Sequence, residues 1–303
     1  MGNFDGLGKE DKQKLNNPIL KNQNEPEYVK LLKASSYAYS KAKRGENNIK
    51  WFLLILAIAY PICYLLIKNH TLELILYGCS FVLTILIEIF ADSIKGNVAQ
   101  GALFKEQFDT KIFNMRWKST LEEPLPGDIG LFSNQYRGKE EIKDWYSQNL
   151  SASIEHNIAV AVLQFSNTSW DINLRKVYRR FLIYILMFYS IILSVFIVAM
   201  KIDALTIFLL LFSLLPFFTY FISLIREQYG AIEKRVSVSK HLYKIIKNKI
   251  NIDSNELRDI QDEIYSIRKE GSKVPNFYSR WFRTKGITTT GDLIEEVNKI
   301  YSS

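Results

Sequence analysis

The chain has 303 residues, of which 48% are hydrophobic, and it carries a formal net charge of +8 at pH 7. Its two cysteines and three histidines are widely separated and it has no glycine-rich phosphate loop, so we expect no disulfide framework, no metal site, no catalytic residue, no cofactor and no enzymatic activity. The mean hydropathy of −0.03 averages strongly apolar and strongly polar segments, so the class of protein follows from how these segments alternate.

A polar segment comes first. Residues 1–25 are rich in Asn and Lys and are expected to be disordered. Pro26 can begin a helix that runs to Gly45, because proline is well suited to the first helical position. Residues 1–50 therefore form a polar N-terminal segment with one helix, ahead of the apolar part of the chain.

Four apolar runs follow, each long enough or nearly long enough to cross a hydrocarbon core of about 30 Å. The last two contain no charged residue, which argues against the alternative of buried helices in a large soluble core. We therefore predict four transmembrane helices in two antiparallel hairpins, 51–91 and 181–225. Pro61 and Pro216 can kink their helices, although simple packing is the favoured role. The runs are Trp51 to Ile67, Leu72 to Ala91, Phe181 to Met200 and Ala204 to Ile225.

Positive charge predicts the orientation of these spans. Of the 39 Lys and Arg residues, 37 lie in residues 1–50, 92–180 and 226–303, and only Lys68 and Lys201 lie in the two short turns. Because cytoplasmic loops carry the excess of Lys and Arg, both termini and the 92–180 segment are predicted to be cytosolic. This basic cytosolic face also suits anionic lipid or an anionic ligand.

The cytosolic segments are predicted to be helical as well, so the expected class is all-α. Ala91 to Phe113 continues the second span as a helix, and a loop rich in proline and glycine follows at 124–130. Lys139 to Phe165 has apolar spacing typical of another helix. Thr168 and Asp171 have the spacing of a capping box that would begin a helix leading into the third span.

Beyond the fourth span, apolar residues continue at spacings of three and four as far as Ile250. This seam either packs on the cytosolic domain of its own subunit, which we favour, or forms an oligomeric stalk. Asp253 is expected to cap a helix that ends near Gly271, and a last helix covers 291–301. The basic and aromatic segment 277–285 lies either at the lipid interface or on the cytosolic domain.

The second span carries a stripe of polar side chains at helical spacing. Glu88 lies well inside this span, where a charge is costly and usually faces a bundle interior or water. The stripe either forms interhelical hydrogen bonds in a static bundle or lines a pore, which requires a homo-oligomer because one four-helix subunit could hardly enclose a conduit. Ion selectivity stays open: Glu88 favours cations, whereas the basic cytosolic segments together with Lys68 and Lys201 favour anions, to which we give a slight preference. The candidate pore-lining residues are Tyr77, Ser80, Thr84 and Glu88.

A basic and aromatic cluster lies at the cytosolic end of the third span. Arginine side chains suit phosphates and aromatic rings suit bases, so the cluster is a candidate nucleotide site. Topology alone also places such residues at a cytosolic helix end, and this alternative stays open. Asp171 can instead cap the helix or pair with Arg175, four residues later. The candidate ligand-binding residues are Trp170, Asp171, Arg175, Tyr178 and Arg179.

The same cluster resembles the sequence pattern of a known family. Shorter matches in the same order extend the resemblance over about residues 90–285. Family members usually have Cys-Gln-Arg where this chain has Leu163-Gln164-Phe165, so an arginine that could contact a phosphate is missing. Gln164, Asn167, Trp170, Asp171, Leu174, Arg175 and Tyr178 follow the Q-x-x-N-x-x-W-D-x-x-L-R-x-x-Y pattern of the SMODS-associating four-transmembrane effector family.

The resemblance implies an effector of the CBASS type of bacterial anti-phage signalling, located in the inner cell membrane. Such an effector would bind a cyclic dinucleotide or oligonucleotide messenger in the cytosol and permeabilise the membrane through a pore, leading to abortive infection. The expected partners are the messenger, the lipid bilayer and further copies of the chain, but no DNA or RNA polymer. The alternative function is a non-conducting membrane scaffold that recruits partners through its cytosolic helices.

Overall fold

The computed structural model describes residues 17–66, 70–138, 142–146, 149–275 and 291–301, and within these ranges it is helical without a β-strand. The predicted all-α class is therefore confirmed. The elements are η1 (Pro18–Leu20), α2 (Pro26–Leu66), α3 (His70–Ile112), α4 (Pro126–Asn134), α5 (His156–Ser169), α6 (Ile172–Ala199), α7 (Ala204–Ser213), α8 (Leu215–Lys247) and α9 (Ser254–Glu270), with a further helix at residues 291–301.

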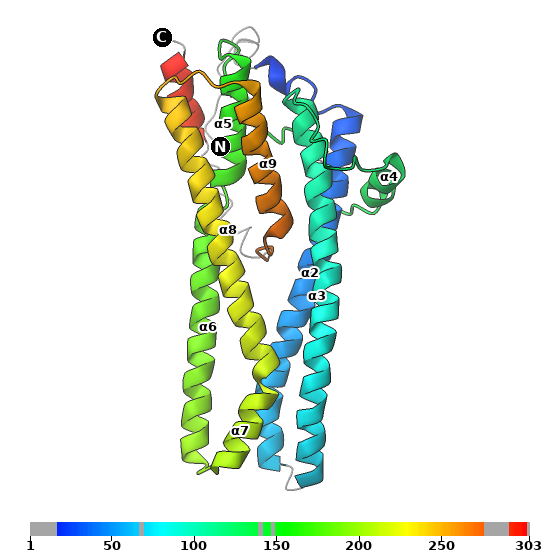
Figure 1. Ribbon diagram of the computed structural model, residues 1–303, viewed down its shortest axis with the longest axis vertical. Helices are drawn as coiled ribbons and strands as arrows, with labels where there is room; N and C mark the ends of the chain where they lie inside the picture. Colours follow the sequence, from blue (N-terminus) through cyan, green and yellow to red (C-terminus); the bar gives the residue numbers. More distant parts are fainter. Residues whose placement is uncertain (1–16, 67–69, 139–141, 147–148, 276–290, 302–303) are drawn as a thin grey trace.

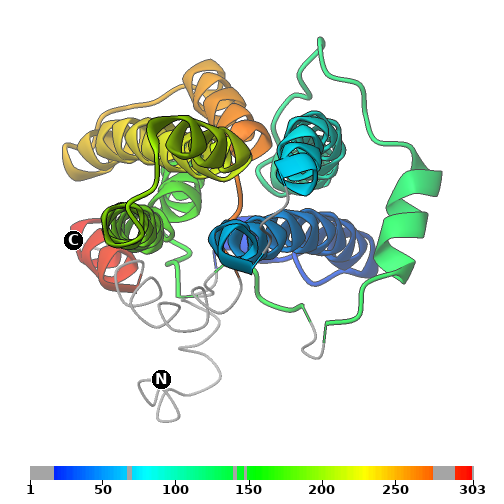
Figure 2. The same cartoon turned by 90° about the horizontal axis from the view of Figure 1, so that it is seen from below.

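The first two long helices, α2 and α3, lie side by side as an antiparallel pair (Figures 1 and 2). They contain 41 and 43 residues, so at 1.5 Å per residue each is about 60 Å long. α2 begins at Pro26 as predicted, and it continues through Pro61 without a break. α3 ends at Ile112, which confirms that the helix of the second apolar run extends far beyond that run.

Two glycines allow α2 and α3 to approach closely. A β-carbon at Gly45 would lie 2.8 Å from Ile94 of α3, and one at Gly101 would lie 2.8 Å from the Tyr39 ring of α2. Both distances are too short for real side chains, so only glycine fits this spacing without movement of its neighbours. Ser35 also donates a buried 2.8 Å hydrogen bond to the Gly101 carbonyl. The upper halves of α2 and α3 are thus tightly joined.

The second pair of long elements consists of α6 and the broken helix α7–α8. The helix axis bends by 52° between α7 and α8, at Leu214. Pro216 follows in the first turn of α8 and cannot donate a backbone hydrogen bond to the preceding turn, which explains the break. The expectation that Pro216 serves simple packing therefore missed a real bend at this position.

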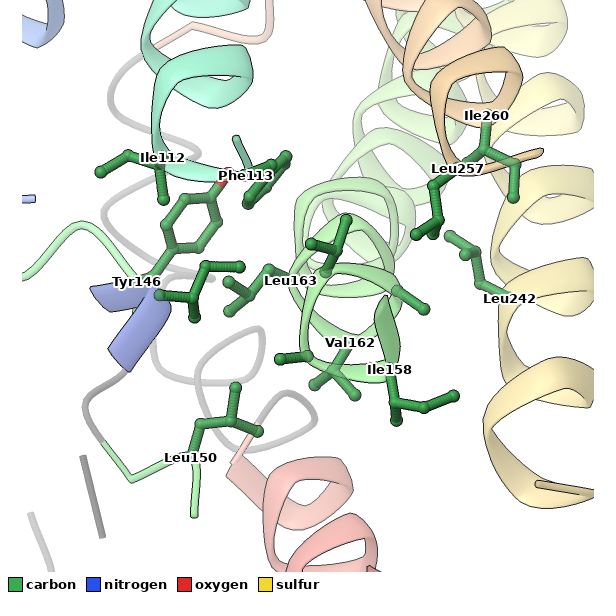
Figure 3. Packing of buried hydrophobic residues seen from close by; sticks show 14 of the residues in the cluster. Ile112, Phe113, Tyr146, Leu150, Ile158, Val162, Leu163, Leu242, Leu257 and Ile260 are labelled. Atoms are coloured by element: carbon green, nitrogen blue, oxygen red, sulfur yellow. The ribbon is translucent and has the colours of Figure 1, made fainter. Parts of the chain in front are cut away.

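Buried apolar side chains form two cores in the two halves of the molecule. The first core packs α5 between α2, α3, α8, α9 and the last helix, and Figure 3 shows Val162 and Leu163 of α5 inside it. The second core packs Leu53 of α2 with Leu182 of α6 and Phe217 of α8. The end of α2, the start of α3 and the α6–α7 junction lie together at the far end of the second half (Figure 1).

The outside of the second half is covered with large apolar side chains. In water such a surface would be unfavourable, whereas lipid removes this cost. By length and composition two stretches, Pro26–Tyr64 and His156–Ala199, can cross a membrane, and α7 with α8 is a third if the bent pair is one span. A membrane protein is therefore supported, and the four-span arrangement stays a prediction. Representative exposed side chains are Ile58, Phe90, Phe188 and Phe208, which are 60–67% exposed.

The predicted helix from Lys139 to Phe165 is wrong over most of its length, because α5 begins only at His156. Side chains near the N-terminus bind the intervening backbone instead. Asn17 donates to the carbonyls of Ser151 and Ile154, and Gln23 accepts from the Tyr146 amide. These long-range hydrogen bonds compete with helical ones, and apolar spacing alone does not reveal them.

Two other local predictions also need correction. The loop rich in proline and glycine contains the short helix α4, which begins at Pro126. Thr168 and Asp171 do not form a capping box: Thr168 donates to the Phe165 carbonyl inside α5, and the Asp171 side chain makes no capping hydrogen bond. Only Trp170 and Asp171 separate α5 from α6, so the last turn of α5 lies directly before the first amides of α6.

The C-terminal part agrees better with expectation. Asp253 caps α9 by accepting hydrogen bonds from the Asn255 and Glu256 amides, and α9 ends immediately before Gly271. Along α8, Ser239 is buried against α5, whereas Tyr229 is half exposed, so the seam packs mainly within its own subunit. Residues 1–16 and the basic and aromatic segment 277–285 lie outside the described residues.

Candidate functional site

The predicted ligand cluster lies where the first core meets the apolar half of the molecule. Here the Asp171 carboxylate, at the start of α6, binds two guanidinium groups. Arg175 Nε lies 2.7 Å from Oδ2, and Arg235 Nε of α8 lies 2.9 Å from Oδ1. The pairing of Asp171 with Arg175 that their spacing suggested is confirmed, and Arg235 is an additional partner.

The segment that follows α9 also contacts this ion pair between α6 and α8. Arg175 Nη1 donates to the side chain of Gln228 at 2.9 Å and to the Ser272 carbonyl at 3.0 Å. Gln228 in turn donates to the Ser272 hydroxyl. Arg175, Asp171, Arg235, Gln228 and Ser272 are all at least 90% buried, and we call them the Asp171 node. The node connects α6, α8 and the segment after α9.

Positive charge exceeds negative charge around this node. Burial alone would raise the pKa of Asp171, but Arg235 and Arg175 outweigh that effect and lower it. Lys273 is also buried, and burial together with Arg175 and Arg235 lowers its pKa. Its amide donates to Glu46 of α2 at 3.1 Å, and its Nζ donates to the Arg268 carbonyl. Arg175, Arg235 and Lys273 thus lie around Asp171, and Glu46 is a second buried carboxylate beside Lys273.

The remaining predicted ligand residues divide between interior and surface. Tyr178 is buried and its hydroxyl accepts a 3.1 Å hydrogen bond from Lys50 of α2. Trp170 is 46% exposed. The Arg179 guanidinium lies over the Tyr229 ring of α8 at 5.2 Å from its centroid. Asp171, Arg175 and Tyr178 therefore make internal contacts, whereas Trp170 offers a surface; their role in ligand binding stays a prediction.

A second buried network lies deeper in the first core. Asp109 of α3 accepts a 2.7 Å hydrogen bond from the Tyr146 hydroxyl and pairs with Lys105 at 3.0 Å and Arg268 at 2.6 Å. Asn167 of α5 donates to the same hydroxyl. Burial lowers the pKa of Lys105 to about 7, although Asp109 opposes this shift. Two neighbouring parts of the sequence pattern, 164–167 and 171–178, thus make contacts in two separate internal networks.

Sequence reasoning missed Arg235, Gln228 and Ser272 as parts of the node. The signal that could have found Arg235 and Gln228 is a polar side chain within the otherwise apolar face of α8, since such a group needs a buried partner. Ser272 binds mainly through its backbone carbonyl, which no sequence pattern specifies.

The predicted polar stripe of α3 is also divided. Ser80 is buried, and its hydroxyl is hydrogen-bonded to the hydroxyl of Tyr60 of α2. This contact agrees with the alternative that the stripe forms hydrogen bonds between helices. Thr84 donates to the Ser80 carbonyl of its own helix. Glu88 is exposed and lines a cavity. The side chain of Tyr77 lies outside the described residues, so the structure brings together no continuous pore-lining surface from the other three.

This cavity has a volume of about 520 Å³ and lies between α2, α3, α8 and the end of α9. A smaller cavity of about 150 Å³ lies at the starts of α5 and α9. Among the described residues, no group of three or more His, Cys, Asp and Glu side chains could hold a metal ion. The larger cavity is lined by Glu46, Ile49, Glu88, Ala91, Ile94, Lys95, Gly96, Val98, Ala99, Tyr220, Ser223, Leu224, Glu227, Lys269, Glu270, Gly271 and Ser272.

Comparison with known proteins agrees with this architecture. The family model described as "SMODS-associating 4TM effector domain" matches residues 17–296. A protein of Bacillus cereus (strain VD146) described as a probable CBASS effector molecule is 30% identical over 168 residues, which are 52% of this chain and 55% of that protein. The chain thus covers about half the length of this relative. No solved structure matches the chain. Because the family model covers most of the sequence, the chain belongs to the SMODS-associating 4TM effector family.

Proposed function

We propose that the protein is an inner-membrane effector of anti-phage defence that binds a cyclic dinucleotide or oligonucleotide in the cytosol and opens a pathway through the bilayer. Its four apolar runs would form four spans in two hairpins, with both termini in the cytosol, and several copies would surround the pathway. Family membership, the description of the Bacillus relative and the exposed apolar surface support this proposal.

The observation that carries the messenger part is the excess of buried positive charge at the Asp171 node. Burial, together with the nearby Arg175 and Arg235, lowers the pKa of Lys273, while Asp171 and Glu46 supply the negative charge beside these three side chains. A cyclic dinucleotide brings two phosphates, which would compensate this excess through charge-assisted hydrogen bonds. The node therefore suits an anionic ligand that competes with Asp171 for the arginines.

Aromatic surfaces next to the node suit the bases of such a ligand. Trp170 is 46% exposed beside Asp171, and Tyr229 is 50% exposed beneath Arg179. Stacking of a base on an aromatic side chain contributes about 1–3 kcal/mol. We propose that the bases rest on Trp170 and Tyr229 while the phosphates replace Asp171 at the buried arginines.

The position of the node also supports coupling to the membrane. α6 runs from Ile172 and α8 runs back to Leu215, so both helices pass from the node into the apolar half. A ligand that changes the contact between α6 and α8 at one end would shift the two helices at the other, which is a common form of conformational switching.

Proteoliposomes test this proposal directly. Purified protein is incorporated into liposomes that contain KCl, and ion efflux is recorded after the addition of individual cyclic dinucleotides and trinucleotides. We expect efflux with one messenger and none without it, and the same messenger should bind the detergent-purified protein in calorimetry. Specific binding without efflux would instead favour the non-conducting scaffold, and neither binding nor efflux with any cyclic oligonucleotide would refute both parts of the proposal.

A further inference from the structure

Two arginines lie at the level where the exposed apolar surface of α6 and α8 ends. Arg180 of α6 directly precedes the charge-free run that begins at Phe181, and Arg226 of α8 directly follows the charge-free run that ends at Ile225. α6 and α8 are antiparallel neighbours, so the two runs end at the same level (Figure 1). This level is the predicted boundary between the lipid and the cytosol.

A contact between a guanidinium group and an aromatic ring fixes the register of the two helices here. The Arg179 guanidinium lies 5.2 Å from the centroid of the Tyr229 ring. Arg180 is the next residue of α6, and Arg226 lies about one turn before Tyr229 on the same side of α8. Both Arg180 and Arg226 are exposed, so they belong to one outer surface of the α6–α8 pair.

Neither arginine is neutralised within the part of the chain that the structure describes. Arg180 Nε makes only a long 3.5 Å hydrogen bond to a backbone carbonyl of its own helix, and Arg226 forms no ion pair with a described carboxylate. Glu227, the next residue of α8, lines the cavity between α3 and α8 instead. Glu233 accepts a hydrogen bond from the Tyr229 hydroxyl. This surface therefore has an excess of positive charge.

Two further cations lie beside these arginines. Lys176 is exposed one turn before Arg180, and we call Lys176, Arg180 and Arg226 the α6–α8 basic face. Next to it, the buried Nε of Arg179 has no hydrogen-bond acceptor among the described residues. A buried donor without an acceptor costs free energy, so an anion at this level would be stabilising.

On the membrane side of the basic face the surface is apolar. Ile222 lies one turn before Arg226 on α8 and is exposed. Tyr184 and Phe188 follow Arg180 at successive turns of α6 and are 64% and 67% exposed. Cationic groups next to a continuous apolar strip fit an amphiphile with an anionic head and a hydrocarbon tail, whereas a soluble anion would use only the cationic part.

We propose that the α6–α8 basic face binds the headgroup of one anionic phospholipid, whose acyl chains lie along the apolar strip. The phosphate accepts charge-assisted hydrogen bonds from Arg180 and Arg226, because a guanidinium group presents several donors that match phosphate oxygens. A zwitterionic lipid fits less well, since its own cationic group would lie near the arginines. This lipid site depends neither on the messenger nor on a pathway through the bilayer.

Native mass spectrometry of the full-length protein in a mild detergent tests the site. Phosphatidylglycerol and phosphatidylcholine with the same acyl chains are titrated, and the dissociation constants for the first bound lipid are compared. The wild type should bind phosphatidylglycerol more tightly. Arg180→Gln with Arg226→Gln should weaken phosphatidylglycerol binding by about tenfold or more and remove the preference. Both side chains are exposed, so this double variant should fold.

A matched control removes two exposed lysines that lie farther along α8 from the apolar surface. Lys240→Gln with Lys244→Gln changes the net charge by the same amount and should leave phosphatidylglycerol binding unchanged. Equal phosphatidylglycerol affinity in the wild type and the double arginine variant would overturn the site. An equal loss of affinity in the lysine control would also overturn it, because the attraction would then depend only on net charge.

Glycerol 1-phosphate distinguishes a lipid site from a site for any phosphate. It carries a phosphate but no acyl chain, so a large excess should fail to displace phosphatidylglycerol from the wild type. Displacement would show that the apolar strip contributes nothing and would overturn the assignment of a lipid.

Discussion

Arg235 Nε of α8 lies 2.9 Å from Oδ1 of Asp171, and Arg175 holds the other carboxylate oxygen at 2.7 Å. One buried carboxylate thus neutralises two guanidinium groups from two helices. Because the side chains of all three are at least 90% buried, water cannot replace the carboxylate if its charge is removed. At this end of the α6–α8 contact, two buried positive charges therefore depend on a single negative charge.

Replacement of that charge should destabilise the protein strongly. Asp171→Asn leaves two buried guanidinium groups without a counter-ion, which typically costs about 3–5 kcal/mol. The variant should unfold at a markedly lower temperature in a detergent-based thermal assay. The control Asp259→Asn removes an exposed carboxylate and should behave as the wild type. Equal melting temperatures for Asp171→Asn and the wild type would mean that this node contributes little to stability.

Removal of the exposed indole should affect messenger binding and leave stability unchanged. Trp170→Ala loses a stacking contribution of about 1–3 kcal/mol, so the calorimetric dissociation constant should rise by about fivefold to 150-fold. Trp145→Ala is a matched control, because Trp145 is 45% exposed and Trp170 is 46% exposed. A larger loss of affinity in Trp145→Ala would place the messenger near Trp145, away from the Asp171 node.

The buried lysine of the first core should make stability depend on pH. Burial lowers the pKa of Lys105 to about 7 in the folded protein, whereas in the unfolded chain it returns to about 10.4. Between these values the unfolded state binds a proton that the folded state lacks. The free energy of unfolding should therefore rise by up to about 1.4 kcal/mol per pH unit from about pH 7 to pH 10.

Lys105→Met should lose this rise, because its side chain does not titrate. The measurement is the unfolding midpoint of the wild type and the variant at a series of pH values, and the quantity of interest is the difference between the two. Lys240→Met, at an exposed position of α8, should retain the wild-type dependence. Parallel profiles for the wild type and Lys105→Met would show that Lys105 stays charged in the folded protein.

Reporter fusions should confirm the orientation. The split of 37 Lys and Arg residues on one side against two on the other predicts that fusions after residue 202 report the periplasm. Fusions at residues 130 and 303 should report the cytosol. A periplasmic reading at residue 303 would reverse the topology and place the Asp171 node on the wrong side of the membrane for a cytosolic messenger.

The long helices could be predicted because their signals are local. The charge-free runs and the continuing apolar spacing of α3 and α8 depend on residues within a few turns of one another. The pair of Asp171 with Arg175 was visible for the same reason, since a spacing of four residues places both on one face of a helix.

The errors share a different cause. The region before α5 has helical spacing, but hydrogen bonds from Asn17 and Gln23, more than 120 residues away, bind its backbone in another conformation. The role of Arg235 likewise could not be predicted, because its ion-pair partner Asp171 lies far away in the sequence. Single-sequence patterns describe neighbours along a helix, and these contacts arise only when distant elements pack together.

The bend at Leu214 makes the pair of α6 with α7–α8 easier to deform than the pair of α2 with α3. α2 and α3 are both unbroken, and Gly45 and Gly101 let them pack closely together, so this pair should resist bending. The α7–α8 element has lost helical continuity at one point and can flex there by a small change of torsion angles. A force applied at the end that carries the Asp171 node would therefore deform α6, α7 and α8 before it deforms α2 and α3.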